Sequence, residues 1–266
     1  MGLMRQGLIL CLVLAAPAAF GQTTAARPLQ SGRSEILQPE AEQLFALANE
    51  ARAAQGAGRL KWDAALATAA RQHCVRMVAE GQIAHRYGGE PDLTERAGKA
   101  GAHFSLIEEN VAIGPDPDAI HSEWMHSPGH RTNLLNPEVD RVGLAVVASR
   151  GVLYAVADYA RGVPDLTPGQ VEAAIGALIR VSGVTVLKDL AVARAACALD
   201  RGLPATKSSL EPQFVMRWQD ADLTRLPQPL LDRLTSGQFH QAAVGSCAPH
   251  DVEGAFTMHR VAVLLY

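Results

Sequence analysis

The chain has 266 residues, of which 48% are hydrophobic and 19% charged, and its formal net charge is −3 at pH 7. This length suits one large domain or two ordinary ones, and the apolar content is enough for a buried core, which excludes an intrinsically disordered chain. No basic stripe is available to neutralise phosphates, so we expect no nucleic-acid partner.

The first residues have the pattern of an export signal. Arg5 gives a positive start, residues 7–16 are apolar, and Ala19 and Gly21 suit positions −3 and −1 of a cleavage site. The apolar run is too short to span a bilayer comfortably. We therefore predict that residues 1–21 are a signal peptide, and that the mature protein is secreted or periplasmic with no stable membrane span. An uncleaved membrane anchor is the alternative.

Helical patterns come early in the chain and paired strands come late. A polar, flexible lead over 22–34 precedes segments in which apolar residues recur at spacings of three and four. Helices are expected over these segments, which are 39–55, 64–77, 93–100 and 117–125. The β-branched runs 142–147 and 152–157 flank Ser149-Arg150-Gly151 and predict a β-hairpin. This order indicates an α+β fold and not an alternating βαβ chain.

The second half of the chain carries three landmarks of the first half in the same order. Leu166-Thr167-Pro168 matches Leu37-Gln38-Pro39, the helix containing Cys197 matches the one containing Cys74, and Val244-Gly245 matches Val142-Gly143. The His- and Glu-rich middle of the first half has no counterpart. We predict a tandem repeat, with a complete domain over 35–164 and a degenerate copy over 165–266. Chance similarity between Ala-rich segments is the alternative.

This repeat also suggests how the cysteines pair. Cys11 lies in the signal, so the mature chain keeps Cys74, Cys197 and Cys247. Export permits disulfides, and an odd number leaves at least one thiol unpaired or paired between chains. Cys247 falls on the strand next to the helix of Cys197, which predicts a Cys197–Cys247 disulfide. Cys74 is then the remaining thiol, packed as a small hydrophobic side chain.

Candidate functional residues gather in one segment. Six of the nine histidines lie between His73 and His130, together with Glu90, Glu108, Glu109 and Glu123. Imidazole and carboxylate groups both donate lone pairs to divalent metals and both serve in acid–base chemistry. The cluster therefore predicts a metal site or an acid–base site.

Three short strings in this segment occur in a characteristic order. Ile83-Ala84-His85 is followed by Glu109-Asn110-Val111-Ala112, and then by the string SPGHRTNLLNP at 127–137 ahead of a VGLA strand at 142–145. Over about residues 37–160 the chain resembles the CAP superfamily of cysteine-rich secretory, antigen-5 and pathogenesis-related proteins, its bacterial branch above all. The resemblance implies a three-layer α/β/α sandwich, secretion, and a shallow cleft whose His/Glu cluster binds a divalent metal in some members.

The resemblance also assigns the site residues. His85 and His130 match the two cleft histidines, and Glu109 matches the first cleft glutamate. Relatives have a second glutamate where this chain has Ser127-Pro128. Glu123 and Glu108 are the nearby substitutes, and neither matches the motif. The expected metal set is therefore His85, Glu109 and His130, either with Glu123 as a fourth ligand or as three ligands alone.

The residues at the start of the helix that carries His130 support a role for His130 as a metal ligand. Ser127 is a suitable N-cap, and Pro128 fits the first helical position. The positive end of the helix dipole favours a neutral imidazole at His130, and the neutral form is the one that binds metals.

The predicted function is binding. We expect an exported CAP-like protein that holds a divalent metal, zinc or another ion, and contacts an extracellular or periplasmic ligand such as a lipid, glycan or protein. One alternative is a metal-dependent hydrolase acting on peptides or the cell wall, with Glu109 or Glu123 as general base. Another is a structural surface module without metal. A serine hydrolase is disfavoured because no GxSxG string is present.

Overall fold

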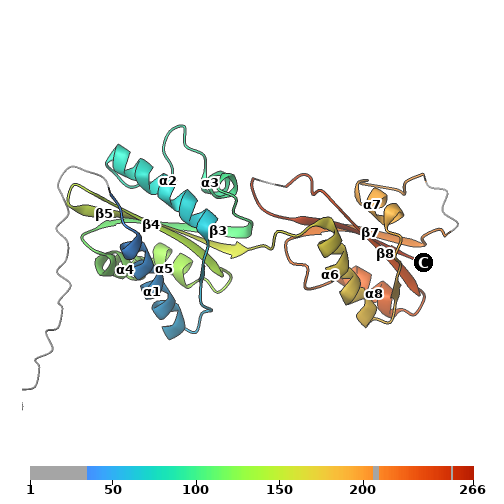
Figure 1. Ribbon diagram of the computed structural model, residues 1–266. Coiled ribbons are helices and arrows are strands. Elements are labelled where there is room, and N and C mark those ends of the chain that lie inside the picture. Colours follow the sequence, from blue (N-terminus) through green and yellow to red (C-terminus); the bar gives the residue numbers. More distant parts are fainter. Residues whose placement is uncertain (1–34, 206–209, 253) are drawn as a thin grey trace, which may run out of the picture.

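The chain folds as two halves, each built on its own β-sheet (Figure 1). A computed structural model describes residues 35–205, 210–252 and 254–266. The predicted signal peptide and flexible lead lie outside these described residues. Within them, no helix combines the length and the apolar character that crossing a membrane requires.

The first half is a mixed α+β unit. Its strands have the order β1-β4-β5-β3, and β2 pairs with β4 in parallel. Its elements in chain order are β1 (Glu35–Ile36), α1 (Gln38–Ala54), β2 (Lys61–Trp62), α2 (Ala64–Glu80), α3 (Leu93–Lys99), β3 (Phe104–Gly114), α4 (Pro117–His126), α5 (Pro128–Leu135), β4 (Arg141–Ser149) and β5 (Val152–Gly162).

Helices cover both faces of this sheet, which confirms the predicted α/β/α sandwich. Successive side chains of a strand point to opposite faces. Val146 accordingly joins the core under α1, α4 and α5, where Trp124 is buried. Val147 joins the core under α2, where Cys74 and Met77 are buried.

The predicted hairpin is present, whereas the short strands β1 and β2 and the long strand β3 were not predicted. β4 and β5 pair antiparallel from Arg141–Ala160 to Ser149–Val152, in agreement with the sequence pattern. β3, which pairs with β5, was expected to be a connection between helices. Its charged residues Glu108 and Glu109 interrupt the apolar alternation that marks a half-buried strand.

The second half repeats this topology in shortened form. Its strand order is β6-β8-β9-β7, and β6 pairs with β8 in parallel, as β2 does with β4. A disulfide joins Cys197 to Cys247, and Cys74 is a buried free thiol, as predicted. The elements are α6 (Pro168–Val181), β6 (Thr185–Val186), α7 (Ala191–Cys197), β7 (Phe214–Asp220), α8 (Gln228–Thr235), β8 (Gln241–Cys247) and β9 (His259–Leu265).

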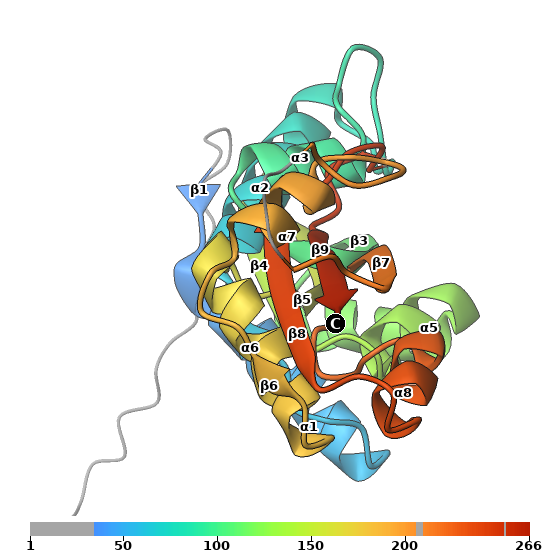
Figure 2. The same cartoon turned by 90° about the vertical axis from the view of Figure 1, so that its right-hand side faces the viewer.

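The matched glycines have the same role in both halves. A Cβ atom on Gly143 of β4 would lie 2.0 Å from the backbone nitrogen of Ala67 in α2. A Cβ on Gly245 of β8 would lie 2.2 Å from the carbonyl carbon of Ala193 in α7. Each glycine lets a helix lie directly on a central strand. Viewed from the end, α7 lies on the side of α2, and α8 on the side of α5 (Figure 2).

Candidate functional site

The candidate site is built on β3, where one strand presents two polar residues in succession. Glu109 and Asn110 lie in the middle of the strand, and both are buried although they are polar. Because neighbouring strand residues face opposite sides, they contact different layers. Glu109 is directed to the α2–α3 side, where it meets His85 and Arg96. Asn110 donates to the carbonyl oxygen of His130, at the start of α5.

His85 and Glu109 form the pair at the centre of the site. Nδ1 of His85 lies 2.8 Å from Oε1 of Glu109, and this hydrogen bond raises the pKa of the imidazole. The other carboxylate oxygen of Glu109 accepts from Nη2 of the buried Arg96. Arg96 also donates to the carbonyl oxygen of His85 over 3.1 Å. The His85 side chain is nevertheless 61% exposed. Its ring is therefore fixed through Nδ1 while the rest of the ring is accessible to solvent.

A second histidine–carboxylate pair supports this one from inside the protein. His73 is fully buried on α2, with Nδ1 2.7 Å from Oε1 of Glu90 and Nε2 2.8 Å from the carbonyl oxygen of Ala84. Both ring nitrogens of His73 are therefore occupied, one by a carboxylate and one by a carbonyl oxygen. This pair lies directly behind Glu109, since Nε2 of His73 is 3.9 Å from Oε2 of Glu109.

A fifth buried ionisable group lies behind Glu109. Asp158 of β5 pairs with Glu109 of β3 in the sheet register and is fully buried. Burial first, and then the charge of Glu109, raise the pKa of this carboxyl well above its usual range. No N–H or hydroxyl group of the described residues donates to its oxygens. Burial and the neighbouring carboxylate therefore both favour the protonated form of Asp158.

The other two predicted ligands form a looser pair. Nδ1 of His130 is buried, has no hydrogen-bond partner among the described residues, and lies 3.9 Å from Oε1 of Glu123. The expected cap of this helix is absent, because the side chain of Ser127 makes no capping hydrogen bond. The start of α5 is held instead by Asn110, and Asn133 further along donates to Asn110 over 3.0 Å.

The four predicted ligands thus lie in two pairs, His85 with Glu109 and His130 with Glu123. No set of three or more His, Cys, Asp or Glu side chains is gathered for a metal ion in the described part of the chain. Glu108, the other substitute, accepts from Asn136 over 3.0 Å. Each oxygen of Glu109 accepts one hydrogen bond, Oε1 from His85 and Oε2 from Arg96.

Residues 45–159 match the family model described as CAP, the cysteine-rich secretory protein family. The first half of the chain is a CAP domain. The Bacillus subtilis (strain 168) protein YkwD, described as uncharacterized, is 31% identical over 110 residues, which are 40% of this chain and 42% of the relative. The membrane protein YlbC of the same strain is 28% identical over 132 residues, 43% of this chain and 37% of its own. The chain thus spans less than half the length of these curated relatives.

Solved structures are similar to about half of the chain. An outer surface protein from Borrelia burgdorferi has 20% sequence identity and a TM-score of 0.46, and the match covers 49% of this chain and 99% of that protein. An extracellular protein containing an SCP domain, from Bacillus anthracis str. Ames, has 27% identity and a TM-score of 0.43, and the match covers 46% of this chain and 40% of that protein.

Three residues that shape the CAP-domain site were not identified from the sequence. Arg96 and Asp158 were not singled out, and His73 was named only as one histidine of the cluster. Asp158 carries a recognisable signal, because it is an acidic residue inside the apolar run 152–160. Arg96 carries none, since its role depends on where α3 places it.

Cys74 does not supply a nucleophile to this site. The thiol of Cys74 is fully buried, and burial raises its pKa to about 12. It is therefore protonated at neutral pH and cannot form a Cys–His nucleophile pair with His85.

Proposed function

We propose that this chain is an exported CAP-domain protein whose cleft binds a divalent metal ion through the rings of His85 and His130. The observation that supports the proposal best is the arrangement of His85, with Nδ1 hydrogen-bonded to the fixed carboxylate of Glu109 and the ring exposed. Metal-ligating histidines characteristically donate their second ring N–H to a carboxylate, which sets the tautomer and the ring orientation.

In this proposal Glu109 orients a ligand and is not itself one. Its two oxygens are engaged by His85 and Arg96, so a metal would have to displace one of these partners. His130 fits the second ligand position, since its Nδ1 is buried without a hydrogen-bond partner among the described residues and Glu123 stands 3.9 Å away. The ion would supply a fixed positive charge for an oxygen-bearing ligand, and zinc suits imidazole donors.

Export is the other part of the proposal. It is supported by the signal pattern at the N-terminus and by relatives described as an outer surface protein and an extracellular protein. The cleft would then contact a lipid, a glycan or another protein outside the cytoplasm. We propose binding and no catalytic step, because Glu109 is buried and each of its oxygens already holds a side chain of the site in place.

Calorimetric titration with zinc tests the metal site. The wild-type protein should bind Zn²⁺ in the micromolar range or tighter, and His85→Ala and His130→Ala should each abolish this binding. Glu109→Gln should weaken it by about 10- to 100-fold, the usual effect of changing a carboxylate behind a ligating histidine.

His126→Ala is the matched control, because His126 lies on the same helix as Glu123 and bonds only to groups of Ser122 within the described residues. It should bind zinc as the wild type does. Absence of zinc binding in the wild type, or binding that survives both His85→Ala and His130→Ala, would contradict the proposal and leave the cluster as scaffold.

A further inference from the structure

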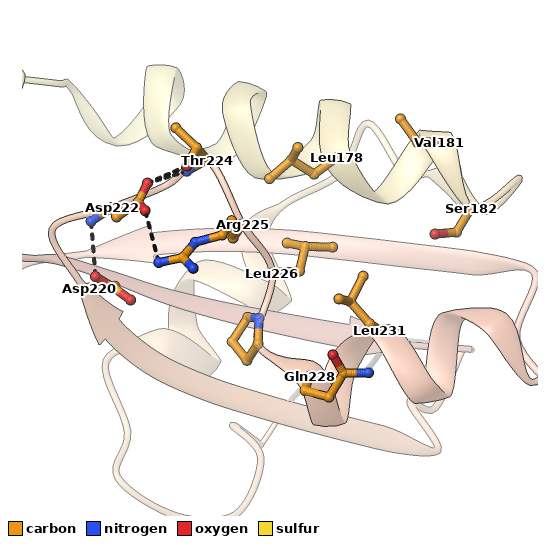
Figure 3. A pocket seen from close by; sticks show the side chains of 11 residues that line it. Leu178, Val181, Ser182, Asp220, Asp222, Thr224, Arg225, Leu226, Gln228 and Leu231 are labelled. Atoms are coloured by element: carbon orange, nitrogen blue, oxygen red, sulfur yellow. Dashed lines mark hydrogen bonds and ion pairs between the residues drawn. The ribbon is translucent and has the colours of Figure 1, made fainter. Parts of the chain in front are cut away.

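A groove of about 660 Å³ lies on the second half of the molecule, between α6 and α8 (Figure 3). Leu178, Val181 and Leu231 line its apolar part, and Leu226 closes its floor. Asp222 and Arg225 lie at one end, joined by an ion pair of 3.4 Å. Val181, the last residue of α6, is 87% exposed, so a large aliphatic side chain faces solvent at the rim of the groove.

The corresponding place in the CAP domain is filled by a helix. There α4 packs between α1, α5 and β3, and it buries Ile120 and Trp124 in the core. In the second half, α6, α8 and β7 take the positions of α1, α5 and β3 in the shared topology. The chain between β7 and α8 is described without a gap and forms no helix, and the groove lies where that helix would be.

Local sequence explains why the chain forms no helix of its own there. After β3, Asp116 caps a helix by accepting from the backbone N–H of Ala119, and α4 follows. After β7, Asp222 accepts instead from the N–H of Thr224, only two residues on, which closes a turn. Pro227 follows closely, and the residue before a proline is disfavoured in a helical conformation. The segment therefore forms a turn where the CAP domain begins a helix.

We propose that this groove binds an amphipathic α-helix of a partner protein, with two large apolar side chains four residues apart on its buried face. Amphipathic helices whose apolar side chains recur at this spacing commonly bind in hydrophobic grooves. The charges agree, because α4 begins directly after β3, and at the corresponding end of β7 Asp220 leaves one carboxylate beyond the Asp222–Arg225 ion pair. Carboxylates stabilise the N-terminal end of a helix through its dipole. This site is separate from the metal cleft.

The chain itself provides a probe for this site. A fluorescein-labelled peptide of residues 115–127 carries α4 with its Ile120 and Trp124, the side chains that fill the equivalent place in the CAP domain. Fluorescence anisotropy with the purified protein should give a micromolar Kd. The same peptide with Ile120→Ala and Trp124→Ala should not bind.

Val181→Glu on the protein should weaken binding at least tenfold by placing a charge in the apolar groove. Its matched control is Val75→Glu on α2, an aliphatic helix residue that is 47% exposed and lies outside the groove. Val75→Glu should bind like the wild type. Equal affinities of the two variants, or no binding of the wild-type peptide, would overturn the proposal. Saturable binding of a fatty-acid probe that Val181→Glu abolishes, with no peptide binding, would overturn it in favour of a lipid.

Discussion

Glu109 has a second buried carboxyl group directly behind it. Glu109 accepts from His85 and Arg96, and Asp158 lies behind it in β5. Burial first, and then repulsion from Glu109, raise the pKa of Asp158 and favour its neutral form. We expect this neutral form to let Glu109 accept both hydrogen bonds without a like charge behind it.

Replacing Asp158 with asparagine should change how stability depends on pH. The folded-state pKa of Asp158 is raised, so as pH rises above about 4 the unfolded chain releases this proton while the folded chain keeps it. The free energy of unfolding of the wild type should therefore fall relative to Asp158→Asn from pH 4 upward, by at most about 1.4 kcal/mol per pH unit. Urea unfolding between pH 4 and 8 measures this difference.

The control is Asp165→Asn, at a carboxylate whose side chain is 82% exposed. Its stability profile should run parallel to that of the wild type. If the profile of Asp158→Asn also runs parallel, Asp158 is ionised in the folded protein and the neutral-acid interpretation is wrong.

At the scale of elements, contact between helix and strand depends on the glycines of β4 and β8. Ala at position 143 would place its Cβ 2.0 Å from the backbone nitrogen of Ala67 and 2.1 Å from the carbonyl carbon of Leu66. Backbone atoms of a helix cannot rotate out of the way as a flexible side chain can. The whole of α2 would therefore have to move away from the sheet. That movement would disturb the layer that carries His73 and Cys74.

Gly143→Ala should therefore lower the free energy of unfolding by about 3 kcal/mol, the upper part of the range for overpacking. Chemical denaturation measures it. Gly129→Ala is the opposite case, because nothing lies within 4 Å of its added Cβ and the position is helical. It should raise stability by about 0.5–1 kcal/mol. A loss below about 1 kcal/mol for Gly143→Ala would show that α2 is not held against the strand.

Sequence reasoning succeeded where periodicity is strong and failed where long-range contacts decide. The hairpin of β4 and β5 and the helix α4 were predicted because their apolar residues repeat at the spacing of one element. β3 was not predicted, because its polar residues break the apolar alternation of a strand. They are buried only through partners distant in the chain, such as Arg96 and His130. The pairing of His85 with Glu109 follows from family resemblance, whereas the buried charges behind it require the folded chain.

At the scale of the whole molecule, the two halves are held together by the segment before β9. Phe256 meets Phe104 of β3 edge-on, with ring centroids 5.5 Å apart. The N–H of Thr257 donates to the carbonyl oxygen of Phe104 over 2.8 Å. Ala255 packs so closely on α3 that a Cβ on Gly98 would lie 2.5 Å from its own Cβ. The second half therefore contacts the helix whose Arg96 fixes Glu109.

Phe256→Ala should uncouple the unfolding of the two halves. Removing a half-buried ring and its aromatic contact should lower the free energy of unfolding by about 2 kcal/mol. The lost contact lies at the junction between the two halves and not in the core of either half. Differential scanning calorimetry should then resolve two transitions where the wild type shows one. Phe45→Ala is the matched control, since Phe45 meets Trp62 edge-on at 5.6 Å inside the CAP domain. It should lower the melting temperature without adding a transition. If Phe256→Ala only shifts a single transition in the same way, contacts elsewhere couple the halves, and α3 does not depend on this segment for its position.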